Sequence, residues 1–121
     1  MKKTTVLLVS ASLSLSLSGC SSDYSDSESP NRIDYESGFM WAGSLAFQLA
    51  EEAEASGSAN SREEGHVEAA TVMKELYGTF ESGCRTVVES NFEDEFPAGS
   101  ARDAWVQGCV DFMHSIEERW P

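Results

Sequence analysis

Apolar residues recur every three or four positions along most of this chain, and this spacing restricts the possible fold more than any other feature of the sequence. The longest apolar stripe runs from Val67 to Val88. An α-helix brings residues three and four apart onto one face, whereas a half-buried strand requires alternation at every second position. No stretch alternates at period two for more than a few residues. The sequence therefore predicts an all-α fold.

Two interruptions divide this pattern. The segment from Gly57 to Asn60 stops the first stripe, and Pro97 with Gly99 stops the second. Ser61 followed by Glu64 has the spacing of a capping box, which predicts that a helix begins there. We therefore predict three helices, over about 33–56, 62–91 and 101–120. They are expected to pack as a small antiparallel three-helix bundle that forms one domain, 33–121.

The first predicted helix carries a strongly apolar face from Phe39 to Ala50. Gly38 and Gly43 each lower helix propensity by up to about 1 kcal/mol relative to alanine, so they indicate close helix packing or a bend. Aromatic side chains bury large areas and dominate cores. We expect this face to be part of the core, with a partner-binding surface as the alternative.

The N-terminus has the order of charge and hydropathy that is typical of a secretory signal. Lys2 and Lys3 precede an apolar run from Val6 to Leu17 that is interrupted mainly by serines. A spanning helix needs roughly 20 mainly apolar residues, and this run is shorter. It therefore predicts export and cleavage, not a membrane span.

The residues Leu17, Ser18, Gly19 and Cys20 at the end of this run are similar to the lipobox of bacterial lipoprotein precursors, a resemblance that covers residues 1–20 only. In that family the cysteine receives a diacylglyceryl thioether before the signal is removed. The resemblance implies that residues 1–19 are cleaved off and that Cys20 carries the acyl lipid. It also implies that the protein is extracytoplasmic and anchored to the cell membrane by this lipid. An ordinary signal peptide with an incidental Cys20 is the alternative.

Residues 20–32 predict a flexible tether between Cys20 and the helices. Serines and acidic residues dominate this segment, which leaves little to bury. A tether of about eleven residues has a typical reach on the order of 18 Å. We therefore expect the domain to lie close to the lipid bilayer, which is its first predicted partner.

The charge of the chain is strongly acidic, −13 for all 121 residues. Removal of residues 1–19 takes away Lys2 and Lys3 and no acidic residue, which leaves 6 basic and 21 acidic residues and a charge of −15. Nucleic acid is bound through clustered Lys and Arg, and these six are scattered, so we exclude nucleic acid as a partner. The same charge repels anionic head groups, and only the acyl lipid is expected to hold the protein to the membrane.

Cys84 and Cys109 are the two thiols that remain once Cys20 is acylated, and in an exported, oxidising setting we predict a disulfide between them. In an antiparallel hairpin they lie ~12 Å and ~13.5 Å from the connecting loop, so their heights match. Gly83 and Gly108 precede them and are expected to remove bulk where the two helices approach. The bridge should stabilise the fold by roughly 3.5 kcal/mol. A redox pair is the alternative, but catalytic dithiols usually lie close in sequence.

The best candidate metal ligands are His66 and His114, each preceded by an acid in Glu63-x-x-His66 and Asp111-x-x-His114. Di-iron bundles combine Glu-x-x-His pairs from different helices. If Cys84 faces Cys109 in an antiparallel pair of helices, the numbers of any two facing residues sum to about 193. His114 then faces Thr79, whereas the residue that would face His66 lies beyond position 121. We therefore predict no metal site from these pairs.

Two acidic groups offer weaker cation sites. One consists of Asp111 and Glu118 around His114, and the other is the run 93–95 in the second loop. Calcium requires six to eight oxygen ligands in a defined arrangement, and no EF-hand spacing is present. We interpret both groups as solvated surface.

No catalytic motif stands out in the sequence. It contains no Gly-x-Ser-x-Gly, no His-Glu-x-x-His and no phosphate-binding loop. We expect a non-enzymatic binding or accessory module of the cell envelope, with no cofactor besides the lipid on Cys20 and with an unidentified envelope protein as candidate partner. A small envelope enzyme or a weak metal-binding lipoprotein is the alternative.

Overall fold

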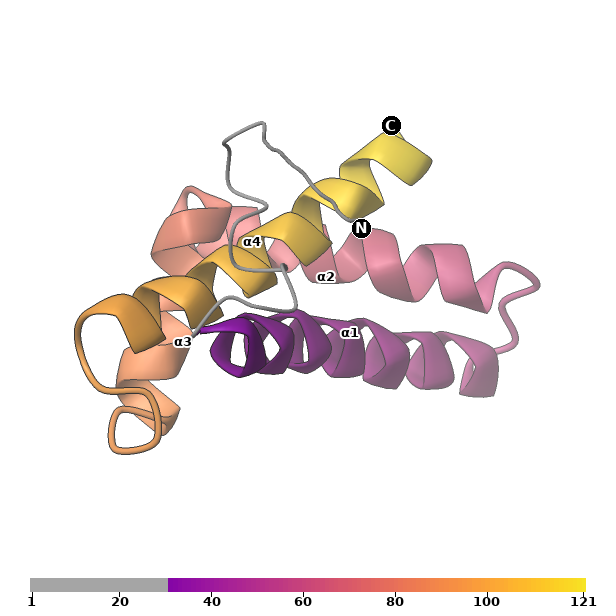
Figure 1. Cartoon of the computed structure of the whole chain (residues 1–121). Coiled ribbons are helices and arrows are strands. Elements are labelled where there is room, and N and C mark those ends of the chain that lie inside the picture. Colours follow the sequence, from indigo (N-terminus) through magenta and orange to yellow (C-terminus); the bar gives the residue numbers. More distant parts are fainter. Residues whose placement is uncertain (1–30) are drawn as a thin grey trace, which may run out of the picture.

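The computed structural model describes residues 31–121, and all regular structure in this part of the chain is α-helical (Figure 1). Its helices are α1 (Arg32–Ala55), α2 (Ser61–Tyr77), α3 (Phe80–Asn91) and α4 (Ser100–Arg119). The predicted all-α class is confirmed, and every predicted outer boundary lies within about one residue of an observed one. The predicted number of three helices is wrong, because the segment predicted as a helix over 62–91 forms both α2 and α3.

The break between α2 and α3 lies at Gly78 and Thr79. Gly78 has φ of +89°, in the left-handed region that a residue with a Cβ adopts only at a cost. Thr79 then caps α3, because its side-chain oxygen accepts a hydrogen bond of 3.0 Å from the backbone N–H of Ser82. Tyr77 and Phe80 lie three positions apart on either side of the break. The helical spacing therefore continues across it, which is why periodicity alone predicted one helix.

The predicted capping box at the start of α2 does not form. Ser61 is already the first helical residue, and Asn60 occupies the capping position without a side-chain hydrogen bond to the helix. Glu63 and Glu64 lie in the first turn, where negative charge interacts favourably with the helix dipole. The start of α2 is thus stabilised by charge and not by a capping side chain.

Helix α4 is the central element of the fold. The chain forms two antiparallel hairpins, α1 with α2 and α3 with α4, and α4 crosses the first hairpin (Figure 1). Helix α4 contacts all three other helices. Its Trp105 and Met113 are the largest fully buried side chains of the described residues. The core therefore lies along α4, with the other helices arranged around it.

Three aromatic rings from different parts of the chain surround Trp105. The ring of Trp41 in α1 lies 5.7 Å from it, and those of Phe92 and Phe96 in the loop before α4 lie 5.9 and 6.1 Å away. Aromatic pairs at such separations stabilise beyond the burial of their area alone. The loop between α3 and α4 is thus fastened to the core on its apolar side. Its acidic run 93–95 is exposed, as predicted.

Two glycines allow α1 and α4 to touch through their backbones. A Cβ on Gly38 of α1 would lie 1.9 Å from the carbonyl oxygen of Trp105, and a Cβ on Gly108 of α4 would lie 2.0 Å from that of Tyr35. Each helix therefore contributes one glycine to the crossing. The close packing predicted from Gly38 is confirmed. Gly43, by contrast, faces the ring of Phe112 at 3.4 Å, which is near an ordinary contact distance.

The apolar stretch 39–50 of α1 is divided between core and surface. Ala42 and Ala46 are fully buried, whereas Met40 and Phe47 are 68% and 61% exposed. Trp41, Leu45 and Leu49 are partly buried and pack against the core. The prediction that this stretch belongs to the core is therefore correct for most of its apolar residues, and the exposed large side chains, such as Met40 and Phe47, form an outer face.

Candidate functional site

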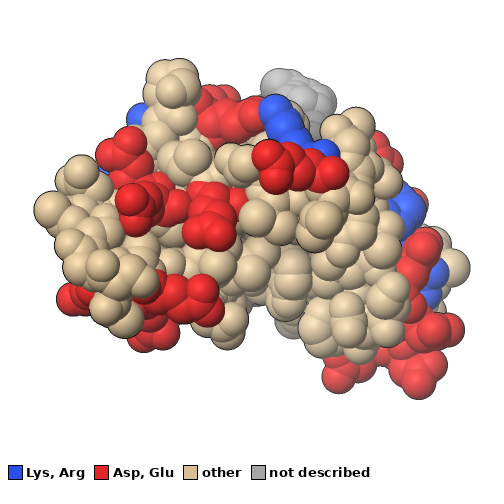
Figure 2. Space-filling model, turned by 180° about the vertical axis from the view of Figure 1, so that it is seen from behind, with Lys and Arg blue, Asp and Glu red and all other residues tan. Residues whose placement is uncertain are grey.

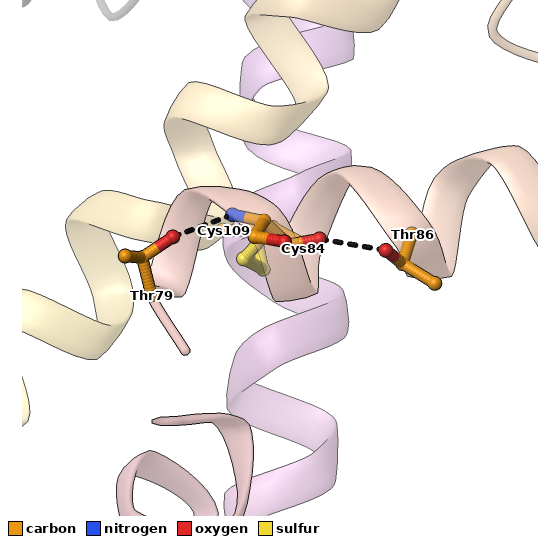
Figure 3. Close-up of a disulfide and its surroundings, with 5 residues drawn as sticks. Thr79, Cys84, Thr86 and Cys109 are labelled. Carbon is orange, nitrogen blue, oxygen red and sulfur yellow. Dashed lines mark hydrogen bonds between the residues drawn. A yellow bond between two sulfur atoms is a disulfide. The ribbon is translucent and has the colours of Figure 1, made fainter. Parts of the chain in front are cut away.

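A disulfide joins Cys84 of α3 to Cys109 of α4, as predicted, with the two Cα atoms 6.0 Å apart (Figure 3). Both cysteines are fully buried. Thiol–disulfide exchange requires a thiolate to reach one of the sulfur atoms. Burial therefore supports a structural bridge over a redox pair.

The glycines that precede the cysteines do not act as predicted. A Cβ on Gly83 would meet the sulfur of Met73 at 2.1 Å, and Gly108 faces α1 and not α3. A residue adjacent to a cysteine in a helix points about 100° away from it. Gly83 therefore allows α2 to pack closely against α3, and Gly108 allows α1 to pack closely against α4. Neither glycine brings the two cysteines together.

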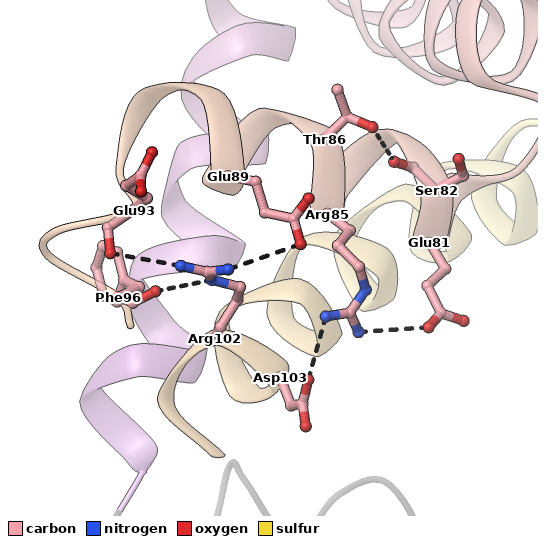
Figure 4. Close-up of polar contacts among 9 residues, drawn as sticks. All are labelled: Glu81, Ser82, Arg85, Thr86, Glu89, Glu93, Phe96, Arg102 and Asp103. Atoms are coloured by element: carbon pink, nitrogen blue, oxygen red, sulfur yellow. Dashed lines mark hydrogen bonds and ion pairs between the residues drawn. The ribbon is translucent and has the colours of Figure 1, made fainter. Parts of the chain in front are cut away.

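Ion pairs reinforce the outer side of the α3–α4 hairpin (Figure 4). The guanidinium of Arg85 in α3 lies 3.2 Å from Asp103 in α4 and 3.5 Å from Glu81. Arg102 of α4 lies 3.7 Å from Glu89 and donates a hydrogen bond of 3.0 Å to the carbonyl oxygen of Phe96. These pairs follow the register that the disulfide predicts, so the antiparallel arrangement of this hairpin is confirmed.

The two histidines lie in separate aromatic environments. His114 contacts Phe80 edge-on with ring centres 5.1 Å apart, beside Thr79 as predicted. His66 was predicted to face no residue, which is wrong. Its ring lies 5.3 Å from that of Trp120, and its Nδ1 lies 2.8 Å from the carbonyl oxygen of Arg62. The prediction failed because the register of α3 does not continue into α2 past the break.

Asp111, the acid of the second predicted pair, serves α1 and not His114. It accepts a hydrogen bond of 2.6 Å from the hydroxyl of Tyr35 and one of 2.7 Å from the side chain of Gln107. Burial, together with this bond to Asp111 and its charge, raises the pKa of Tyr35 well above its ordinary value. Within residues 31–121, no group of three or more His, Cys, Asp or Glu side chains is placed to hold a metal ion.

A groove of about 680 Å³ lies between α2 and the C-terminal end of α4. Its apolar lining consists of Val67, Ala70, Ile116, Trp120 and Pro121. A second hollow of about 490 Å³ shares Val67 and Thr71 with it and extends toward the start of α2. The two together form one continuous concave surface along α2, which we call the α2 groove.

One ion pair joins the two sides of the α2 groove. Lys74 of α2 pairs with Glu117 of α4, and both line the groove. The hydrogen bond from Lys74 is the main cause that lowers the pKa of Glu117. Burial opposes it, and the charges of Lys74 and His114 add to the lowering. The charge of the one basic side chain that lines the groove is thus already neutralised.

The remaining charge around the α2 groove is acidic. Its rim carries Glu63, Glu64, Glu68 and Glu75, all exposed. None of these four forms an ion pair within residues 31–121. Acidic side chains also cover far more than basic ones of the face shown in Figure 2. The α2 groove therefore combines an apolar floor with uncompensated negative charge.

Periodicity alone did not identify this groove. It placed Val67 in an apolar stripe and Trp120 at the end of the last predicted helix, but both side chains are only partly buried. The one signal in the sequence is the difference in length between two predicted helices. The segment 62–91 is longer than 101–120, so the last helix cannot cover the whole apolar stripe of the longer one. The direction of α2 after the break determines which residues remain open.

The predicted lipidation residues Leu17, Ser18, Gly19 and Cys20 lie outside the described residues, as does the tether up to residue 30. Among the helices of residues 31–121, none combines the length and the apolar character needed to cross a membrane.

Comparisons of the chain with protein-family models, with curated proteins and with solved structures gave no match.

Proposed function

We propose that this protein is a lipoprotein, anchored on the extracytoplasmic side of the cell membrane through acyl lipid on Cys20, and that its helical domain is a binding module. The lipobox-like residues 17–20 support the anchor. The α2 groove supports the binding role, because it is a concave surface with an apolar floor and an acidic rim whose four carboxylates form no ion pair within residues 31–121. This last observation carries the proposal.

A cationic amphipathic segment of an envelope protein is the ligand that such a groove favours. Apolar side chains of the ligand would cover Val67 and Trp120, at about 25 cal/mol per Å² of apolar surface removed from water. Lysine or arginine side chains on its other face would lie beside Glu64 and Glu68. Complementary charge of this kind raises association rates and selects the partner. The acidic surface also disfavours anionic lipid head groups as occupants.

The anchor is tested with the substitution Cys20→Ala in the full chain. We expect metabolic labelling with a fatty acid to be lost, because no other residue can carry the thioether. Cys84 and Cys109 are in a disulfide and cannot substitute for it. Undiminished labelling of the variant would contradict the anchor and leave the binding role to be judged separately.

The binding role is tested by titrating the purified protein with a synthetic helical peptide of alternating leucine and lysine clusters. Thr71→Lys adds a cation inside the α2 groove, and we expect it to weaken binding by about tenfold. Thr86→Lys is the matched control, since Thr86 is also an exposed helical threonine but lies on α3, outside the groove. Equal weakening by both variants, or equal affinity for a peptide with glutamate in place of lysine, would refute a specific site.

A further inference from the structure

The concave surface along α2 continues past the α2 groove. A further hollow of about 390 Å³ lies at the break between α2 and α3, and its apolar lining includes Phe80 and Val110. We call it the Phe80 hollow. Lys74 lines both this hollow and the α2 groove. Its side chain therefore lies at the boundary between two open surfaces.

Two groups from other helices hold the ammonium group of Lys74. It donates a hydrogen bond to Oε2 of Glu117 in α4, and it lies 4.9 Å from the centre of the Phe80 ring in α3. A carboxylate oxygen attracts a cation through a charge-assisted hydrogen bond, and the face of an aromatic ring attracts it through the ring quadrupole. Glu117 and Phe80 thus form a site for an alkylammonium ion, and Lys74 shows that the site accepts one.

The ring of Phe80 is covered in this arrangement. It is 4% exposed although it lines a hollow, with the ammonium group of Lys74 over the ring and His114 against it edge-on. Departure of Lys74 alone would return apolar surface to water and deprive Glu117 of its hydrogen bond. The site therefore favours the exchange of one alkylammonium group for another over an empty state.

Lys74 is nevertheless held weakly. The side chains of Lys74 and Glu117 are 50% and 40% exposed, and ion pairs at such exposure contribute little to stability. The stem of lysine is flexible, and it regains rotamer freedom when the ammonium group is released. A cation from outside can therefore displace Lys74 at small cost.

We propose that this site binds the ammonium group of a lysine side chain of the partner, which displaces Lys74 from Glu117 and Phe80. Lys74 is then an internal competitor, because it fills the site in the free protein and lowers the affinity for the partner. The inference rests on the proposed binding role of the α2 groove for the source of this lysine. It adds a point at which the partner is recognised and the residue that opposes binding.

The surroundings of Glu117 favour lysine over arginine in the partner. Its Oε1 lies 3.6 Å from Nδ1 of His114, which leaves Oε2 as the oxygen that holds the ammonium group. A guanidinium group binds a carboxylate best through both oxygens at once. The site therefore discriminates against arginine.

Chemical rescue with n-butylammonium chloride tests the site without a partner, because this ion reproduces the side chain of lysine. Lys74→Ala removes the internal competitor from the purified protein, and NMR follows the ring protons of Phe80. We expect saturable shifts, with an affinity about fivefold higher than in the parent protein. The uncharged n-butanol should give no saturable shift. An affinity equal to that of the parent protein, or equal shifts with n-butanol, would overturn the proposal.

Two further variants make the test specific. Lys74→Ala combined with Glu117→Gln should lose the gain in affinity. Arg32→Ala is the matched control for a general loss of positive charge, since Arg32 also pairs with a glutamate at the surface but lies on α1. An equal gain in Arg32→Ala, or a gain that survives Glu117→Gln, would contradict the site. Lys74→Gln, which retains a longer side chain over Phe80, repeats the titration if Lys74→Ala proves poorly folded.

The helical peptide used for the α2 groove separates this inference from the binding role. Lys74→Ala should raise the affinity for that peptide severalfold, and the gain should be smaller for a peptide with arginine in place of lysine. If n-butylammonium binds and the peptide does not, the alkylammonium site stands and the binding role of the α2 groove falls. If the peptide binds the parent protein and Lys74→Ala equally, the binding role stands and the displacement of Lys74 is refuted.

Discussion

The two main contacts of α4 are built in different ways. Toward α3, the contact consists of the Cys84–Cys109 disulfide, large buried side chains and ion pairs on the outer side. Toward α1, it combines two glycines that lie against backbone carbonyl groups with the ring contact of Trp41 and Trp105 and the hydrogen bond from Tyr35 to Asp111. The first contact includes a covalent bond, whereas the second depends on the absence of a Cβ at two positions where the backbones touch. We therefore expect them to fail under different substitutions.

Removal of the disulfide should cause the largest loss of stability at either contact of α4. The double variant Cys84→Ala, Cys109→Ala should lose about 3–5 kcal/mol of unfolding free energy, because the unfolded chain regains the freedom of a 25-residue loop and two buried sulfurs leave a cavity. Urea denaturation measures this loss, and helical circular dichroism at low temperature should remain. An unchanged denaturation midpoint would show that side-chain packing alone holds α3 to α4.

A single methyl group should damage the glycine contact. Gly38→Ala should cost about 2–3 kcal/mol, because the new Cβ would lie 1.9 Å from the carbonyl oxygen of Trp105, a backbone atom that cannot move alone. Gly43→Ala in the same helix is the control, since its nearest neighbour is a ring at 3.4 Å. It should be neutral or stabilise by up to about 1 kcal/mol through helix propensity. Equal effects of the two variants would contradict a backbone contact at Gly38.

The start of α3 provides a smaller test of the bridged side. Thr79→Ala should cost about 1 kcal/mol, because the N–H of Ser82 loses its cap at the point where the chain leaves α2. Thr79→Ser keeps the hydroxyl and should behave like the parent protein. Both are compared by thermal denaturation. A loss as large for serine as for alanine would assign the effect to the threonine methyl group instead.

The smallest expected effect is the pH dependence of the stability that the Lys74–Glu117 ion pair between α2 and α4 provides. The pKa of Glu117 is lowered from 4.5 in the folded state, so the unfolded state binds a proton at a higher pH. The stabilisation is therefore present above about pH 4.5 and is lost as pH falls through the folded pKa. For this exposed pair we expect less than about 1 kcal/mol. Urea denaturation at pH 7 and pH 3 should show a smaller acid loss for Glu117→Gln than for the control Glu118→Gln.

Local patterns in the sequence were sufficient to predict the helical class, the outer boundaries of the helices, the cysteine pairing and the register of the α3–α4 hairpin. These features depend on residue spacing within one helix or across one short loop. Cys84 and Cys109 lie at matching heights on either side of the same loop, so counting residues from the loop identified the pair. The lipid anchor on Cys20 remains a prediction from the resemblance of residues 17–20.

Only the tertiary structure determined the break at Gly78, the α2 groove and the outer face of α1. The apolar stripe keeps its spacing across Gly78, so periodicity cannot reveal that the chain changes direction there. Periodicity shows which residues share a face, but whether Trp120 or Met40 is covered depends on where other helices cross. Gly38 and Gly108 set the α1–α4 crossing by allowing two backbones to touch, a contact between residues far apart in the sequence. The open surfaces follow from that crossing, because a helix held so close to α4 on one side leaves its opposite side uncovered.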